Sequence, residues 1–459
     1  MRGCAFAIVG IFCTLVCEAG ELTGSRSPIV ITGATVIDGT GQRPDNDVVI
    51  VVRGDRIVSI GPKRRIEIPT DAKLVDARGK FIVPGLMDGN VHLIFPNLEE
   101  LVKYEDNYEV LIEEGAQLTL KHGVTTVFDT WGPLQPLMNV RDRIARGEIE
   151  GSRMFVAGNV IGFSGPLGRD FGGGGSRLSR RLNDKIAAIW EENVGPELGL
   201  LSPEQVRVEM VKYIEHGPDF VKYASSAHTP HHLLAFSLSV QQVIVEEAHK
   251  AGLVALAHTT NVESVRMAVE AGADVLIHAH ATETEPLVEP YLSMIKDAGV
   301  IAGIMPMTRV RMASHYKVRS DELLAVMVKN TRALIQANIE TISVTDGSLY
   351  STPSIEKIED WATTLKGGLQ LRARAAVEHG MTPMQALQSI SRNVAHAYGV
   401  LDDLGTLEKG KIADLIILDA DPLIDIGNLN SMSAVMKGGR FISTEMLPVN
   451  PIKTIPQID

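Results

Sequence analysis

The sequence predicts an α/β protein in which a (β/α)8 TIM-like barrel is joined to a small β-domain built from both chain ends. Between about residues 83 and 400, apolar strand segments alternate with amphipathic helical segments. Short β-branched segments separated by glycine turns occupy residues 29–74, and similar segments follow residue 405. Several apolar strands of the middle region end on a side chain that can bind metal or move a proton.

The length of the chain, 459 residues, is greater than one small core needs, which indicates two domains. We expect the β-domain to comprise residues 22–83 and 401–459, and the barrel residues 84–400. The formal charge of -12 argues against nucleic acid or an anionic membrane surface as a partner. We expect a small-molecule substrate and a homo-oligomer.

The first residues resemble a targeting segment. Arg2 precedes an uncharged, mostly apolar run over residues 3–17, and small residues follow it. This pattern is typical of a secretory signal peptide over residues 1–19, and the run is short for a spanning helix. Cleavage after Ala19 would give a secreted or periplasmic protein without a membrane segment. A mis-assigned start codon is the alternative, and the protein would then be cytoplasmic. All three cysteines lie in this run, so metal ligands of the mature chain must be His, Asp, Glu or Lys.

The middle region contains the strands expected for the barrel, and each has a helical segment after it. Helical segments over residues 240–251 and 263–271 both end at a glycine, as helix C-termini commonly do. In a closed parallel barrel, the side chains that follow the strands converge on the C-terminal mouth, where barrel enzymes carry their chemistry. The expected strands are residues 81–87 (continuing to His92), 124–129, 154–161, 220–223, 253–258, 275–278, 300–305 and 341–346.

Imidazoles at these strand ends predict a divalent metal site. His258 and His278 end consecutive strands and can ligate zinc, the expected ion, or cobalt or manganese. His92 and Asn90 lie two residues apart on a strand and therefore face the same side. His92 is a third candidate ligand, whereas Asn90 is a weaker neutral donor that could instead orient a water or a substrate carbonyl. There are two alternatives. The strand-end histidines only satisfy hydrogen bonds in the core, or the metal site has been lost.

Four motifs of the chain form a recognisable set: Pro84-Gly85-Leu86-Met87-Asp88, Met381-Thr382-Pro383-Met384-Gln385-Ala386-Leu387, Gly405-Thr406-Leu407 and Lys409-Gly410-Lys411-Ile412-Ala413-Asp414-Leu415. In this order they resemble the metal-dependent amidohydrolase superfamily. The resemblance covers about residues 32–421 and implies a barrel with a composite β-domain. The lysine on the fourth strand, Lys222, is similar to that of the imidazolonepropionase- and prolidase-like branch. The superfamily usually has His-x-His after the first strand, and Asn90-Val91-His92 instead resembles phenylurea hydrolase and molinate hydrolase.

The resemblance implies hydrolysis of a C–N bond of amide, urea or carbamate type in a small, fairly apolar substrate. It also implies that CO2 can carboxylate Lys222, which then bridges two metal ions. A lysine that stays charged, or one with a pKa lowered by desolvation, is the alternative, so one ion and two ions both stay open.

Asp346 is the expected proton carrier and a further metal ligand. Bound metal makes hydroxide available near neutral pH, and Asp346 would take the water proton and deliver it to the departing nitrogen. His280, two residues beyond His278, is expected to share its facing and to help polarise the carbonyl oxygen, although an ordinary loop histidine is equally consistent with its position.

Residues after the strands predict a substrate pocket made of Trp131, Phe163, Tyr223 and His228, with simple packing as the alternative. Three other functions compete. A dipeptidase or N-acyl-amino-acid hydrolase would need a cation for the substrate carboxylate, and Arg309 and Arg311, after the seventh strand, are the candidates. A non-catalytic barrel that lost its metal centre is supported by Asn90 alone, and ring deamination is the weakest option.

Overall fold

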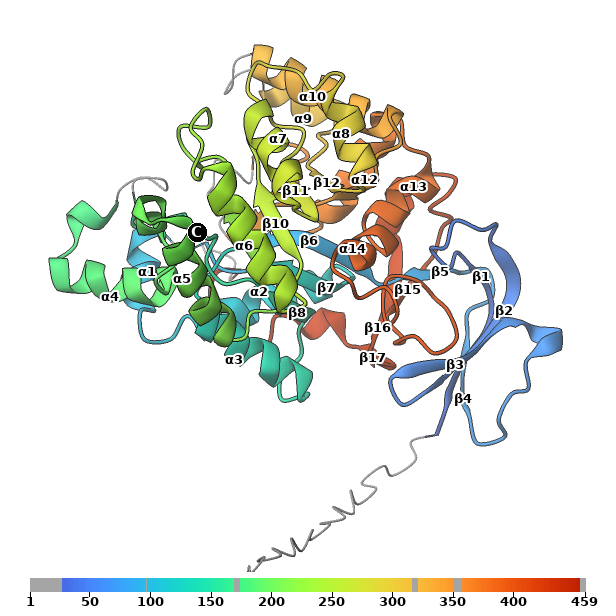
Figure 1. Cartoon of the computed structure of the whole chain (residues 1–459). Helices are drawn as coiled ribbons and strands as arrows, with labels where there is room; N and C mark the ends of the chain where they lie inside the picture. Colours follow the sequence, from blue (N-terminus) through green and yellow to red (C-terminus); the bar gives the residue numbers. More distant parts are fainter. Residues whose placement is uncertain (1–26, 96, 169–173, 316–320, 350–356, 455–459) are drawn as a thin grey trace, which may run out of the picture.

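The computed structural model describes residues 27–95, 97–168, 174–315, 321–349 and 357–454 (Figure 1). The expected signal peptide over residues 1–19 lies outside the described residues. Within them, no helix is long and apolar enough to cross a membrane.

The central strands are parallel and form two arcs, in the orders β14-β6-β7-β8 and β13-β12-β11-β10-β9. On one side, the segment after β8 joins the arcs: Ile161 N donates to Lys222 O at 2.8 Å, and Ala224 N donates to Ile161 O at 2.9 Å. On the other side, the chain runs from β13 directly into β14. The strands therefore follow one another in ring order, as the predicted barrel requires. Their bounds are Leu86–His92 (β6), Val124–Asp129 (β7), Arg153–Val156 (β8), Val221–Ala224 (β9), Ala255–His258 (β10), Val275–Ile277 (β11), Ile301–Ile304 (β12), Thr341–Ser343 (β13) and Gly347–Ser348 (β14).

Helices surround these strands (Figure 1). Their ends follow local capping chemistry: α7 begins after Asn261, whose side chain accepts a hydrogen bond from Ser264 N, and ends at Gly272 with φ 88°. The helices are Leu98–Lys103 (α1), Glu109–Lys121 (α2), Leu134–Ala145 (α3), Arg180–Glu191 (α4), Pro203–Glu215 (α5), Leu238–Lys250 (α6), Val262–Ala271 (α7), Tyr291–Asp297 (α8), Arg309–His315 (α9), Asp321–Gln336 (α10), Gly368–Glu378 (α12), Pro383–Ser389 (α13) and Arg392–Ala397 (α14), with short 3-10 turns at Lys63–Arg65, Gly174–Arg177, Pro196–Leu200, Ile426–Asn430 and Thr444–Met446.

A second sheet combines both chain ends, which confirms the composite β-domain. Its order is β17-β16-β15-β5-β1-β2-β3, with β4 paired to β1, and the two ends meet where β5 pairs antiparallel with β15. Side chains such as Ile31, Ile50 and Leu415 fill its core. The strands are Ile29–Val36 (β1), Asp45–Arg53 (β2), Arg56–Pro62 (β3), Lys73–Asp76 (β4), Phe81–Pro84 (β5), Leu415–Leu418 (β15), Met432–Lys437 (β16) and Arg440–Ile442 (β17).

Two expected segments differ from the structure. The strand expected over residues 81–87 is divided, because β5 pairs in the composite sheet and only β6 enters the barrel. Residues 447–454 leave the composite sheet and pack on α2. Ile452 N donates to Glu114 Oε2 at 2.9 Å, and Leu447 packs against Leu120. A buried carboxylate on a barrel helix therefore holds part of the segment that we assigned to the β-domain.

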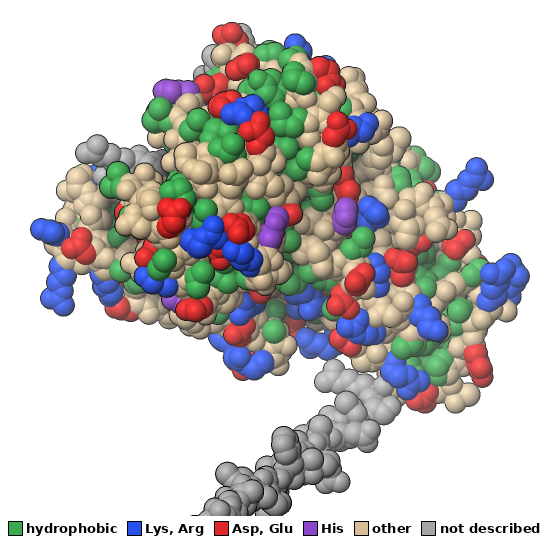
Figure 2. All heavy atoms as spheres, in the orientation of Figure 1, with side chains coloured by type: hydrophobic (Ala, Val, Ile, Leu, Met, Phe, Trp, Pro, Cys, Tyr) green, Lys and Arg blue, Asp and Glu red, His purple; other side chains and the backbone are tan. Residues whose placement is uncertain are grey.

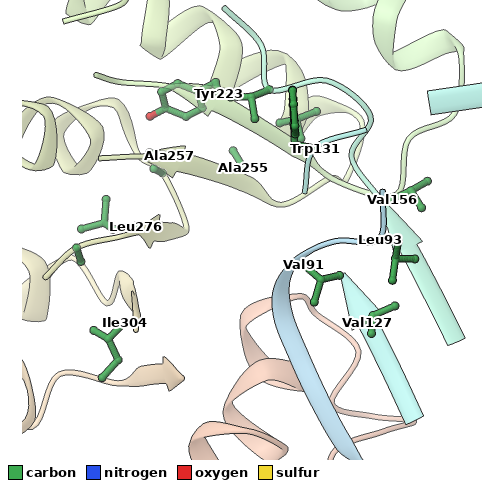
Figure 3. Packing of buried hydrophobic residues seen from close by; sticks show 14 of the residues in the cluster. Val91, Leu93, Val127, Trp131, Val156, Tyr223, Ala255, Ala257, Leu276 and Ile304 are labelled. Carbon is green, nitrogen blue, oxygen red and sulfur yellow. The ribbon is translucent and has the colours of Figure 1, made fainter. Parts of the chain in front are cut away.

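Side chains alternate between the two faces of each barrel strand, so the barrel has an inner and an outer hydrophobic cluster. Phe220 belongs to the inner cluster, where Phe128 stacks on Tyr398 with ring centroids 3.7 Å apart. Val221 and Tyr223 belong to the outer cluster between strands and helices, part of which Figure 3 shows. Because side chains two apart share a face, Lys222 points inward like Phe220, one layer closer to the C-terminal mouth.

Candidate active site

A cavity of about 240 Å³ lies at the C-terminal ends of the barrel strands. It brings together most of the predicted site residues from five separate strand ends. Trp131, Phe163 and His228, predicted as substrate contacts, also line it. The full lining is His92, Phe95, Trp131, Val160, Phe163, Lys222, His228, His258, His278, Asp346, Ser348, Trp361 and Thr363.

Local backbone irregularities aim several of these side chains. In the pairing of β6 with β7, Asp88 lies opposite Val127 and Val91 lies opposite Asp129, so β6 has one extra residue between them. This bulge turns the strand so that Asn90 and His92 approach the mouth. His278 and Asp346 have φ angles of 68° and 54°, in the left-handed region that side chains with a Cβ rarely adopt. Such strain is typical of functional positions.

Asn90 is fully buried and connects two of the predicted ligands. Its Nδ2 donates to Asp346 Oδ1 at 2.7 Å, and its Oδ1 accepts from Lys222 Nζ at 3.0 Å. Thr130 Oγ1 donates to the same Asn90 oxygen. Both lone pairs of that oxygen are therefore used. In this arrangement Asn90 acts as a hydrogen-bonded bridge between the lysine and the aspartate, and its metal ligation stays a prediction.

Three imidazoles of the site, those of His92, His258 and His278, have lowered pKa values and one unpaired nitrogen atom each. His258 Nε2, His278 Nδ1 and His92 Nδ1 are buried and have no hydrogen-bond partner among the described residues. The rings of His258 and His278 are 4.9 Å apart between centroids. Burial lowers the pKa of His278 to about 3 and the pKa of His258 well below its usual value. Neutral imidazole is the form that binds metal.

Asp346 supplies a carboxylate beside these rings. Its Oδ1 lies 3.1 Å from His92 Nε2 and 4.0 Å from His278 Nε2. Burial alone would raise its pKa, but His278, His92 and Lys222 together hold the pKa of Asp346 well below the usual range. An ionised carboxylate is thus kept at the cavity, where it can accept a proton.

This donor set fits a divalent ion in chemistry and location. Neutral imidazole and carboxylate suit a borderline ion such as zinc, and buried unpaired nitrogens are uncommon unless something binds them. The shell is not closed, however: among the described residues, no group of three or more His, Cys, Asp or Glu side chains has metal-holding geometry. His92, which hydrogen-bonds Asp346, is turned toward that carboxylate instead.

Lys222 is the cationic member of the site and is only 2% exposed. Burial lowers its pKa to about 8, although Asp346 and Asp129 oppose the shift. Burial also raises the pKa of Asp129 to about 7. Asp129 accepts hydrogen bonds from Leu93 N and Trp131 N, and so fixes the loop that carries Trp131.

Besides Asn90, which contacts the lining residues Lys222 and Asp346, three predicted residues do not line the cavity. Tyr223 follows Lys222 on the strand, so it points outward into the packed layer of Figure 3. Arg309 is exposed at the start of α9, with its backbone N bonded to Glu378. His280 is buried outside the lining. The rule that residues two apart share a face fails there because His278 adopts a left-handed turn directly after β11.

Other lining residues were not expected. Phe95 and Ser348 follow β6 and β13, so the rule that strand ends form the site would have found them. Trp361 and Thr363 come from a loop before α12, and no motif marks them. The guanidinium of Arg311 lies over the Trp361 ring, 4.7 Å from its centroid. The rings of Phe95 and Trp361 join Trp131, Phe163 and Val160, so that much of the cavity wall is aromatic and apolar.

The comparisons with known proteins agree with this geometry. Residues 81–442 match the model of the amidohydrolase family. A solved structure of molinate hydrolase has a TM-score of 0.89 and 35% identity, covering 94% of this chain and 98% of that one. A crystal structure of phenylurea hydrolase B has the same TM-score and identity, covering 94% of this chain and all of that one, 100%. Imidazolonepropionase of Shouchella clausii (strain KSM-K16) is 25% identical over 432 residues, covering 86% of this chain and 85% of its own length.

Proposed function

Because the chain belongs to the amidohydrolase family, we propose that it is a metal-dependent hydrolase of a C–N bond in an amide, urea or carbamate. The observation that carries this proposal is an ionised carboxylate, Asp346, beside neutral His258 and His278 in one cavity. The largely aromatic wall favours a small substrate with an apolar substituent on nitrogen. The similarity to molinate hydrolase and phenylurea hydrolase B supports this substrate class.

The residues of the cavity have distinct roles in this reaction. His258 and His278 would hold the ion, with His92 and Asp346 as further ligands. The bound ion supplies a water that ionises near neutral pH and an electrophile for the carbonyl oxygen. Asp346 accepts the proton of the attacking water and delivers it to the departing nitrogen, because an amine leaves poorly unless it is protonated.

Lys222 decides how many ions the site holds. An amine reacts with CO2 only in its neutral form, and a pKa near 8 makes that form available at mildly alkaline pH. A carboxylated Lys222 would bridge two ions, whereas an ammonium that donates to Asn90 leaves room for one. The choice can be tested by growing cells in 13C-labelled bicarbonate and recording the carbonyl region of the protein's NMR spectrum. A carbamate signal that is lost in Lys222→Met would support two ions, and the absence of a carbamate signal in the wild-type protein would support one.

The cavity does not favour a dipeptidase. Holding a substrate carboxylate needs a cation, and Lys222 is the only Lys or Arg among the described residues that line the cavity. The two candidates for this role are not among the lining residues: Arg309 is exposed, and Arg311 is buried over the Trp361 ring.

A substrate panel tests the proposal. Purified enzyme loaded separately with zinc, cobalt or manganese is offered phenylureas, thiocarbamates, anilides and dipeptides, and release of the amine is measured. We expect hydrolysis of apolar N-substituted ureas, carbamates or anilides. Activity on dipeptides alone, or on none of these compounds with any ion, would overturn the assignment.

Two further proposals concern the whole protein. We propose that the precursor is secreted or periplasmic and is cut after Ala19, which N-terminal sequencing of protein from the native host tests. We also propose a homo-oligomer, for which light scattering should give a multiple of the chain mass.

A further inference from the structure

A second cavity, of about 420 Å³, lies far from the mouth, at the N-terminal end of the barrel. Its walls are the last turn of α3, the start of β8 and the β16–β17 hairpin of the composite sheet. Figure 2 shows Lys and Arg side chains along the lower border of this face, where Figure 1 draws α3 and that hairpin. The lining is Asp55, Arg141, Ile144, Ala145, Arg146, Gly147, Arg153, Met154, Lys437, Gly438 and Arg440.

The lining is strongly basic, with five cationic side chains and the single carboxylate of Asp55. The four arginines have carboxylate partners outside the lining. These contacts are Arg141 Nη1 to Asp219 Oδ2 at 2.9 Å, Arg146 Nε to Glu148 Oε1 at 2.5 Å, Arg440 Nη2 to Glu150 Oε1 at 3.1 Å, and Arg153 Nη2 to Asp414 Oδ2 at 3.5 Å. The last contact is long for a hydrogen bond and leaves Arg153 weakly neutralised.

Two cationic groups stay incompletely satisfied. Lys437 has no carboxylate oxygen within 4.0 Å and no side-chain hydrogen bond within the described part of the chain, and burial lowers its pKa to about 8. Arg153 Nε is buried without a hydrogen-bond partner there. A half-buried ammonium and an unused guanidinium N–H that share one cavity are costly to leave unpaired.

We propose that this cavity binds a small polyanion, carrying phosphate or several carboxylates, with Lys437 and Arg153 as its principal contacts. Arginine and lysine N–H groups are the usual donors to phosphate and carboxylate oxygens. The described lining contains no aromatic ring, so it offers no stacking platform for a nucleobase. The site is separate from the mouth and does not depend on the proposed hydrolase activity.

Calorimetric titration of the metal-loaded, full-length protein tests the site, with inorganic pyrophosphate and citrate as separate probes at constant ionic strength. We expect saturable binding of at least one: pyrophosphate alone assigns a phosphate ligand, and citrate alone a polycarboxylate. Lys437→Met should weaken the affinity at least roughly tenfold, the effect of losing one charge-assisted contact. Lys437→Arg, which keeps the charge, should retain most of it.

Lys63→Met is the matched control, because Lys63 is exposed on the same β-domain and does not line the cavity. Circular dichroism and retained hydrolase activity show that each variant is folded. Absence of saturable binding by either probe would overturn the proposal, as would equal affinity in Lys437→Met and the Lys63→Met control.

Discussion

Replacing Asp346 by asparagine tests the proton carrier. In the structure, Asp346 Oδ1 accepts from Asn90 Nδ2 at 2.7 Å. An asparagine oxygen can accept the same hydrogen bond, so the fold should survive while the proton acceptor is lost. General acid–base catalysis contributes roughly 10²- to 10⁴-fold. We therefore expect kcat to fall by that factor, about 3 to 5 kcal/mol in activation free energy.

The assay is steady-state amine release from the best substrate of the panel, with metal content measured on the same samples. Asp274→Asn is the matched control, because Asp274 lies at the opposite end of the barrel, where its Oδ2 accepts from Ala255 N at 2.8 Å. Control activity should stay within a few-fold of wild type. An Asp346→Asn enzyme with unchanged metal content and kcat within threefold of wild type would show that Asp346 is not the proton carrier.

Three more outcomes are expected. Asn90→Ala removes the acceptor of the buried Lys222 ammonium and should lower the free energy of unfolding by about 1.5 to 3 kcal/mol, measured by urea denaturation. Unchanged stability would show that the hydrogen bond from Lys222 to Asn90 does not stabilise the fold. The folded pKa of Lys222, about 8, lies below its unfolded value of 10.5, so the unfolded chain binds more protons between them. Lys222 should therefore contribute roughly 3 kcal/mol to the rise in stability of the metal-free protein between pH 8 and 10.5. Lys437, whose pKa is also lowered to about 8, adds its own contribution in this range, so Lys222→Met should reduce the slope without abolishing it. An unchanged slope would contradict this expectation. Trp361→Ala should raise KM for aromatic substrates about tenfold with little change in kcat, because it removes apolar contact in ground and transition states alike, and an unchanged KM would argue against substrate contact.

Much of the barrel was predictable because its signals are local. Alternation along a strand fixed the inward facing of Lys222 and His258, and glycine marked the ends of α6 and α7. The same rule, applied beyond the end of the strand, wrongly predicted that His280 faces the same side as His278, because the backbone turns at His278. Periodicity also could not show that β5 would leave the barrel for the composite sheet.

The aromatic and polar residues of the cavity wall were harder to predict than the metal-capable side chains. The metal-capable side chains follow strands and carry distinctive chemistry, so their convergence follows from barrel geometry. Trp361 and Thr363 reach the cavity from a loop whose path depends on tertiary packing, such as the bond from Arg372 Nη2 to Thr363 Oγ1 at 3.0 Å. The bridging role of Asn90 likewise depends on residues 132 and 256 positions away along the chain.

The proposed dependence of C–N hydrolysis on a divalent ion requires side chains from separate strand ends as ligands. Its most direct test is to strip the protein with a chelator, return zinc in measured amounts, and follow bound metal and amine release together. Activity should disappear with the metal and return in proportion to it, and His258→Ala with His278→Ala should prevent both. Full activity in folded protein free of metal would contradict it.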